Sequence, residues 1–419
     1  MLPGVTASAQ ADLPIDPATV TIRLDRSACY GSCPDYSVTI EGDGRVVFVS
    51  TDRPVDPVSQ VHRQFSRSDG VLLGGHHEIR IPPEEVAALA ARFVAADFGA
   101  LDDEYVARIT DSPTYVLTFT HAGTTKRVVD YVGREVGMPA IVSELERAVD
   151  ETAHTAMWVS GNAMSVDWLR VGGFDFASAQ AGEILLQGAV RDADEDFLLG
   201  MVDAGVDLAR RASLGRERPV LGKALLEAAL HNGQPRLFEH LRSMGWLDRL
   251  GADRAATAFA ERAGGCNPAM PAALAAAGVA IDAPAAEGYG YGSDGDTALL
   301  ALTTSWLCRD ETARVETARQ LLALGADPNH RNAAGESAIF SVENPELLAL
   351  LYANGADPTV IDHNGDSAVF SSWTDAIVLQ HLQAGAPLHG HYYDGRGLRE
   401  QMQHRPMPLS EAWLDAHGL

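Results

Sequence analysis

A short phrase that ends a helix and opens a loop recurs in the second half of this 419-residue chain, and it constrains the fold more than any other feature. The phrase begins at Gly325, Gly355 and Gly385, so its three clearest copies follow one another at equal intervals. A glycine in this place lets the backbone adopt the left-handed conformation that ends many helices. A fixed period in the range of about 20 to 50 residues predicts a solenoid, in which each repeat buries its apolar face against its neighbours.

A second phrase opens the segment that follows each loop. It reads Gly-Asp-Thr-Ala-Leu from Gly295, Gly-Glu-Ser-Ala-Ile from Gly335 and Gly-Asp-Ser-Ala-Val from Gly365. We expect the Thr or Ser hydroxyl to cap the next helix by accepting a hydrogen bond from a free amide. Phe340 and Phe370 occupy equivalent places in successive repeats, and we expect both in the core between repeats.

The stretch ARQLLALGADPN, from Ala318 to Asn329, together with these phrases resembles the ankyrin repeat. That family joins a leucine-rich second helix to Gly-Ala-Asp-Pro-Asn, a loop and Gly-x-Thr-Pro-Leu, and here Ala-Ile-Phe or Ala-Val-Phe replaces its Pro-Leu-His part. The resemblance implies an all-α, ankyrin-type helical solenoid over residues 178–390, with a C-terminal cap over residues 391–419. It also implies a role in binding another protein.

Ankyrin proteins usually bind through the tips of their loops and the face of the first helices. The resemblance therefore gives this chain a set of candidate partner-binding residues at two loop tips. They are Asn329, His330, Arg331, Asn332, Asp362, His363 and Asn364. The alternative for each of them is an ordinary polar loop residue.

Residues 18–153 predict a domain of another class. Apolar residues alternate over 36–40 and return over 45–49 after a Gly-Asp-Gly turn, which indicates a β-hairpin. A helix follows Pro82, a second hairpin spans 114–131, and a second helix starts at Pro139. This order predicts a small α+β domain of two β-hairpins and two helices. Residues 1–17 are interpreted as a leader remnant or linker, and residues 154–177 as a connector.

The segment from Cys29 to Tyr36 reads Cys-x-Gly-x-Cys-Pro-x-Tyr. It resembles the signature of an uncharacterised bacterial domain family over residues 18–151, and that resemblance implies no activity. In an oxidising compartment, Cys29 and Cys33 are expected to close a small disulfide ring, whereas thiol redox chemistry at this pair is the open alternative. Cys266 and Cys308 are expected to be buried small apolar side chains.

The sequence contains no motif typical of a catalytic, phosphate-binding or cofactor site. A zinc site would need His62, His76 or His77 beside the cysteine pair, and His76-His77 is interpreted instead as a solvated polar loop. We therefore predict a non-enzymatic protein without a metal or a cofactor. The alternative is a thiol-active or otherwise enzymatic N-terminal domain, with the repeats as its targeting arm.

The net charge of −25 limits the class of partner. It repels nucleic acid and anionic lipid and favours a basic protein, although it also simply promotes solubility. No apolar run approaches the roughly 20 residues of a membrane-spanning helix, so no membrane insertion is expected. Ala9 and Ala11 resemble the end of a secretory signal, which predicts a periplasmic or secreted protein, with a cytoplasmic one as the alternative.

Overall fold

The computed structural model describes residues 16–31, 33–50, 70–191, 193–212, 218–285, 294–304, 308 and 310–419. Residues 1–15 of the predicted leader remnant and the zinc candidate His62 lie outside the described residues. The chain divides into two compact units, Met1–Phe174 and Asp175–Leu419.

In the described part of the first unit, seven strands form one sheet in the order β4-β3-β2-β1-β6-β7-β5. The strands are β1 (Thr21–Arg26), β2 (Tyr36–Glu41), β3 (Arg45–Ser50), β4 (His76–Arg80), β5 (Glu104–Val106), β6 (Tyr115–His121) and β7 (Thr124–Tyr131). Neighbours are antiparallel except β5 and β7. The predicted hairpins are β2–β3 and β6–β7, but the two-hairpin description is imprecise, because β1 lies between them and pairs with both β2 and β6.

The edge strands β4 and β5 were not predicted, because neither shows the apolar alternation of a strand. The interpretation of His76-His77 as a polar loop is wrong, since both residues belong to β4 and pair with β3. This register places His77 opposite Phe48, with 6.1 Å between their ring centroids. The Nε2 atom of His77 lies 2.9 Å from the carbonyl oxygen of Leu73, so this half-buried side chain is held by the fold rather than lying in a solvated loop.

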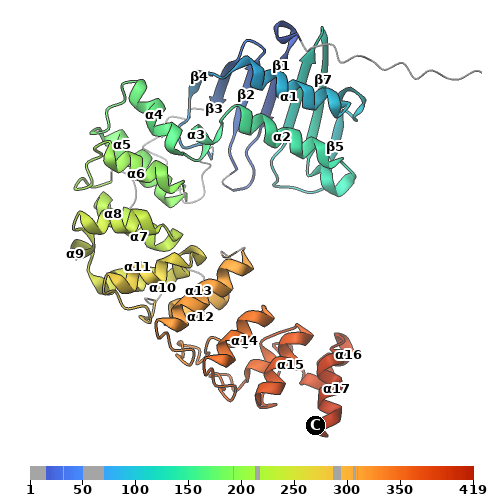
Figure 1. Ribbon diagram of the computed structural model, residues 1–419. Coiled ribbons are helices and arrows are strands. Elements are labelled where there is room, and N and C mark those ends of the chain that lie inside the picture. The colour runs from blue at the N-terminus through green and yellow to red at the C-terminus, as the bar shows by residue number, and fades with distance from the viewer. Residues whose placement is uncertain are drawn as a thin grey trace, which may run out of the picture. The chain divides into compact units, whose positions relative to one another are not determined.

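Period-two alternation gives the sheet one buried and one open face. On β1, Ile22 and Leu24 are fully buried, whereas the residues between and beside them are exposed or half-buried. Two helices, α1 (Pro83–Ala95) and α2 (Ala140–Thr152), lie across the buried face (Figure 1). The open face carries mainly polar side chains, as is common for antiparallel sheets.

Two short helices, α3 (Ala156–Val159) and α4 (Ala163–Val171), occupy the segment interpreted as a connector. Trp158 of α3 is fully buried, and its ring centroid lies 4.8 Å from that of Phe48 on β3. The residues up to Phe174 therefore complete the core of the first unit.

The second unit is helical in its described residues, and its helices follow one another from α5 to α17 (Figure 1). The helices are α5 (Ala179–Val190), α6 (Glu195–Asp203), α7 (Leu221–Asn232), α8 (Pro235–Ser243), α9 (Trp246–Leu250), α10 (Ala252–Arg262), α11 (Ala269–Ala276), α12 (Ala298–Thr304), α13 (Glu311–Ala323), α14 (Pro345–Ala353), α15 (Asp375–Ala384), α16 (Leu398–His404) and α17 (Pro408–His417).

The glycines that define the repeat period each follow the end of a helix. Gly325, Gly355 and Gly385 follow α13, α14 and α15 with φ values of 96°, 87° and 94°, so the expected left-handed helix ends are confirmed. Between α13 and α14, and again between α14 and α15, the chain forms only a single turn, which in the second case is the 3₁₀ turn η6 (Ala368–Phe370). Each of these repeats therefore contains one helix and one turn.

The prediction that the hydroxyl caps the next helix is wrong for Ser367, whose hydroxyl bond the structure shows. The hydroxyl of Ser367 donates to the carbonyl oxygen of Pro387 at 2.6 Å, and η6 has no side-chain cap. The side chain therefore links two repeats instead of capping the start of the next helix. The expectation for Phe340 and Phe370 is confirmed, because they are 3% and 8% exposed.

The last helices close the array. A cluster of buried apolar side chains joins η6 and α15 to α16 and α17, and Trp373 and Trp413 pack against it. Its buried members are Val369, Phe370, Val378, Leu382, Ala386, Tyr392, Leu398, Met402, Met407 and Leu414. Among the described residues, no helix combines the length and the apolar character needed to span a membrane.

The first testable prediction concerns Glu146 on α2, which is 7% exposed. Burial, and then the negative charge of Asp130, raise the pKa of this carboxyl to about 8 from 4.5. Between these values the unfolded chain releases a proton that the folded chain retains, so the free energy of unfolding falls as pH rises from about 4.5 to about 8. Glu146→Gln should therefore stabilise the first unit at pH 9 and change little at pH 4.5.

The measurement is hydrogen exchange of β1 and α2 in the full chain during urea unfolding at both pH values. Glu144→Gln, an exposed change on the same helix, is the matched control. Equal effects of the two variants at pH 9 would contradict the prediction.

The second prediction concerns His381 on α15, which is fully buried and whose Nδ1 lies 2.6 Å from the hydroxyl oxygen of Tyr352. Burial lowers its pKa to about 4 from 6.5, so the unfolded chain takes up a proton in this range that the folded chain does not. The second unit should therefore lose stability as pH falls from about 6.5 to about 4.

The double variant Tyr352→Phe/His381→Leu should remove this acid sensitivity, because no group is left to take up the proton. Urea unfolding followed by hydrogen exchange of α14 and α15 measures the effect, and exposed His404→Leu is the control. An unchanged pH dependence in the double variant would refute the assignment to His381.

Candidate interaction site

The loops between repeats fold into narrow turns that we name the hairpin ridge, residues 326–336, 356–366 and 386–396. In the first turn, the amide of Asn332 donates to the carbonyl oxygen of Glu336 at 3.0 Å, and the amide of Gly335 donates to that of Asn332 at 2.9 Å. The same two bonds recur at the equivalent places of the next two turns, between Asp362, Asp366 and Gly365 and between Tyr392, Arg396 and Gly395.

Backbone bonds also join one turn to the next. The amide of Ala333 donates to the carbonyl oxygen of Asp294 at 2.8 Å, and the amide of His363 donates to that of Ala334 at 2.9 Å. These bonds hold successive turns side by side, so the hairpin ridge is a continuous edge of the second unit.

Two of the predicted partner-binding residues, Asn332 and Asp362, accept hydrogen bonds from backbone amides of their own turns. Asn332 is only 6% exposed, and its Oδ1 accepts from the amides of Ala334 and Glu336, each at 3.0 Å. The equivalent Asp362 accepts from the amides of Asn364 at 2.9 Å and Asp366 at 2.8 Å. Their polar atoms are largely occupied within the protein, so their evident role is structural.

Three further predicted residues tie neighbouring repeats together. Asn329 accepts from the amide of Asp357 at 2.7 Å and donates to the carbonyl oxygen of Gly355 at 2.9 Å. The Nε2 atom of His330 lies 2.9 Å from the carbonyl oxygen of Gly295. Arg331 donates to two backbone carbonyls, one in its own turn and one in the next repeat.

The bond made by Asn329 belongs to a ladder along the array. One repeat earlier, Asp282 accepts from the amide of Asp327 at 3.2 Å in the same way. One repeat later, the position of Asp327 and Asp357 is occupied by Pro387, and proline has no N–H to donate. The ladder therefore ends where the C-terminal cap begins.

His363 and Asn364 are the predicted residues left exposed at a tip, with Arg331 exposed beside them. The ring of His363 covers Gly335, where an added Cβ would lie 2.7 Å from Cδ2 of the ring. Tyr393 was not predicted, although it occupies the position of His363 one repeat later and is 90% exposed. Applying the repeat period to His363 would have predicted it.

The ridge region carries a strong excess of negative charge. Residues 278–396 contain 16 acidic and 5 basic residues, and Asp327 and Asp357 are exposed on the ridge. Hydrogen bonds from Thr359 hold the pKa of Asp357 below its usual range, so this carboxylate stays ionised.

The described arginines of this region have internal partners. Arg314 pairs with Glu311 at 3.2 Å, Arg319 with Glu316 at 3.2 Å and Arg396 with Asp394 at 2.7 Å. The excess carboxylates are therefore not balanced from within the repeats.

The first unit offers a polar cluster at the ends of β1, β2 and β6. Arg26 donates to the hydroxyl of Tyr36 at 3.0 Å and to that of Tyr115 at 2.9 Å, and it pairs with Asp150 at 3.3 Å. The Tyr36 hydroxyl donates to Asp150 at 2.5 Å, and burial raises the pKa of both groups. This network joins α2 to the sheet.

A cavity of about 650 Å³ opens beside this cluster, and its charged lining residues are Asp25, Arg26 and Asp35. Arg26 is paired with Asp150, and Asp25 is paired with Arg23. The hydroxyls of Ser27 and Ser50 accept bonds from backbone amides. Each of these four lining residues therefore has a partner within the protein.

Both cysteine pairs lie at bonding distance. Cys29 and Cys33 form the predicted pair, with 5.4 Å between their Cα atoms. Cys266 and Cys308 are buried as expected, but they are also bonded to each other, with 5.7 Å between their Cα atoms, so their interpretation as separate apolar side chains is wrong. Within the described ranges, no group of three or more His, Cys, Asp or Glu residues is placed to hold a metal ion.

Comparisons with known proteins match part of the first unit to a family. Residues 20–153 match a family described as a domain of unknown function (DUF6438), so the first unit contains an uncharacterised domain. No curated protein matches the chain.

Two solved structures show similarity to the chain. The ankyrin repeat domain of Bcl-3, a member of the IkappaB protein family, is 18% identical; the match covers 54% of this chain and 81% of that one, with a TM-score of 0.24. A chain in the structure of a predatory endopeptidase from Bdellovibrio bacteriovorus in complex with an immunity protein is 17% identical; the match covers 48% of this chain and 94% of that one, with a TM-score of 0.30.

The third prediction separates the structural and the exposed asparagines of the ridge. Asn332→Ala should lower the free energy of unfolding of the second unit by about 2 kcal/mol, because several buried bonds are lost. Asn364→Ala, the same change at an exposed tip, should stay within about 0.5 kcal/mol of wild type. Urea unfolding of the full chain, followed by hydrogen exchange of α13 and α14, tests this, and similar losses for both variants would contradict it.

Proposed function

We propose that this protein is a non-enzymatic binding protein that docks a basic protein partner along the hairpin ridge. The observation that carries the proposal is the excess of acidic over basic residues on the ridge, where Arg331 and Arg396 already have internal partners. A partner with a basic surface gains Coulomb energy there, whereas nucleic acid and anionic lipid are repelled.

The exposed residues of the ridge support a protein partner rather than a free cation. Tyr393 is 90% exposed and Leu388 is 44% exposed, and both lie in the last turn of the ridge. Exposed aromatic side chains are frequent energetic anchors of protein interfaces. Acidic side chains beside such an anchor suit a partner that presents Lys or Arg next to an apolar pocket.

Two bonded cysteine pairs support an oxidising compartment for this function. Disulfides persist in secreted and periplasmic proteins and are rare in a reducing cytosol. The proposal of a non-enzymatic protein is supported by the internal partners of the polar groups around the cavity of the first unit.

The fourth prediction tests the ridge with charge-matched variants of the full chain. The ridge variant is Asp327→Asn/Asp357→Asn, and the control is Glu400→Gln/Glu411→Gln, which removes two exposed charges from α16 and α17. The full chain, immobilised and exposed to extracts of its own cells, should capture a basic protein saturably and less at high salt.

The purified partner should then bind the ridge variant about tenfold more weakly than the control and the wild type. Tyr393→Ala should weaken binding by a similar factor without changing the salt dependence. Equal affinities of the ridge variant and the control, or an acidic partner, would refute the proposed function.

A further inference from the structure

The bond between Cys266 and Cys308 joins two segments that are 42 residues apart in the sequence. Cys266 ends the 3₁₀ turn η5 (Ala263–Cys266) after α10, and Cys308 precedes α13. Their side chains lie in the interior of the second unit, since the residues are 4% and 5% exposed. The bond therefore encloses α11 and α12 in one covalent loop.

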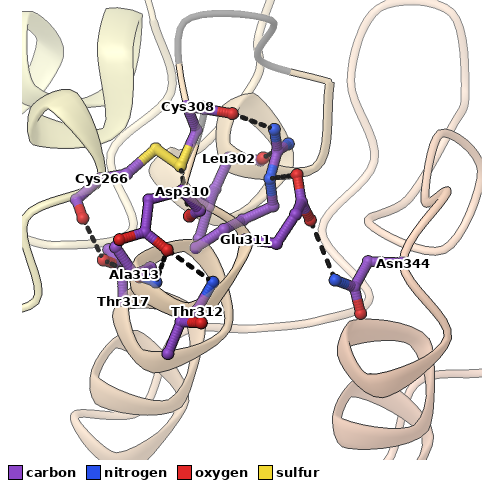
Figure 2. The surroundings of a disulfide bond; sticks show 10 residues. Cys266, Leu302, Cys308, Asp310, Glu311, Thr312, Ala313, Thr317 and Asn344 are labelled. Atoms are coloured by element: carbon purple, nitrogen blue, oxygen red, sulfur yellow. Dashed lines mark hydrogen bonds and ion pairs between the residues drawn. A yellow bond between two sulfur atoms is a disulfide. The ribbon is translucent and has the colours of Figure 1, made fainter. Parts of the chain in front are cut away.

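The backbone carbonyl oxygens of both cysteines accept hydrogen bonds from side chains of α13. The hydroxyl of Thr317 donates to the carbonyl oxygen of Cys266 at 2.9 Å, and Nη2 of Arg314 donates to that of Cys308 at 2.7 Å. Arg314 also donates to the carbonyl oxygen of Leu302 on α12 at 2.8 Å. Figure 2 shows the bond from Thr317 to the Cys266 arm of the disulfide.

The same contacts continue into the next repeat. Asp310, two residues after Cys308, caps α13 by accepting from the amides of Thr312 at 2.9 Å and Ala313 at 3.2 Å. Glu311 accepts from the side-chain amide of Asn344 at 2.9 Å, as Figure 2 shows.

Asn344 in turn caps α14 by accepting from two amides of its first turn. A continuous series of bonds therefore runs from the disulfide through α13 to the start of α14.

The bond encloses a helix of mostly small side chains. Five of the eight residues of α11 are alanine, so this helix buries less apolar surface than a leucine-rich one, although Met270 and Leu274 are fully buried. Cys266 itself adopts a φ of 62°, in the left-handed region that disfavours side chains other than glycine. The covalent link therefore adds a restraint to the hydrogen bonds and apolar contacts of this region.

We propose that the Cys266–Cys308 bond is a redox-controlled staple that sets whether the middle of the repeat array is ordered. When the bond is formed, it fixes the start of α13 against η5. A dithiol reductant donates two electrons and two protons, the sulfur–sulfur bond breaks, two thiols form, and the reductant becomes a disulfide. The released ends then no longer hold α13 and α14 in place, so the array is complete only under oxidising conditions.

The staple does not depend on the identity of any partner, so its test is independent of the test of the proposed function. The test uses the full chain as wild type, as Cys266→Ser/Cys308→Ser, and as Cys29→Ser/Cys33→Ser for the control pair. Hydrogen exchange is measured with and without dithiothreitol, and alkylation with mass spectrometry reports which thiols are free.

We expect no free Cys266 or Cys308 thiol in the unreduced wild type. Reduction should speed exchange in α13 and the first turn of α14 at least about tenfold, with α17 and the sheet of the first unit unchanged. The Cys266→Ser/Cys308→Ser variant should exchange at the fast rate with or without reductant, and the control pair should behave as wild type.

Three results would overturn the staple. They are free thiols at Cys266 and Cys308 before reduction, a bond that dithiothreitol leaves closed in the native protein, and a fully reduced wild type whose exchange in α13 is unchanged. Because reduction acts on the folded wild type, the test remains decisive even when the serine variant does not fold.

Discussion

The hydrogen bonds between neighbouring turns of the hairpin ridge are the interaction on which the second unit depends most. Its repeats are short, because the first helix is reduced to a single turn in two of them, and a shorter helix buries less apolar surface. Bonds such as that from Asp357 to Asn329 supply the register that helix packing supplies only partly. The ladder also sets the end of the array, since Pro387 cannot donate to it.

This use of polar side chains decides what remains for binding. A buried amide such as that of Asn332 cannot serve a partner without leaving its own turn unsatisfied. In the proposed function, recognition therefore depends on the exposed tips and on the charge of the ridge. The staple at Cys266–Cys308 supports the same array from the opposite end of α13.

The first unit follows another principle, because its order comes from strand pairing. The register of β1 with β2 and β6 places Arg26 beside both Tyr36 and Tyr115, and the charge is neutralised by Asp150 from α2. Residues from three elements bind one half-buried guanidinium, which makes the cluster a specific link between sheet and helix.

The sequence by itself determined the local features: the repeat period, the glycine helix ends, the β2–β3 and β6–β7 hairpins and the core positions of Phe340 and Phe370. Each depends on neighbours within a few residues or on an exact repeat. Only the tertiary structure decided the place of β4 in the sheet, the pairing of Cys266 with Cys308 and the inward role of Asn332. These depend on contacts between segments that lie far apart along the chain. A local sequence pattern does not specify which distant group a side chain will contact.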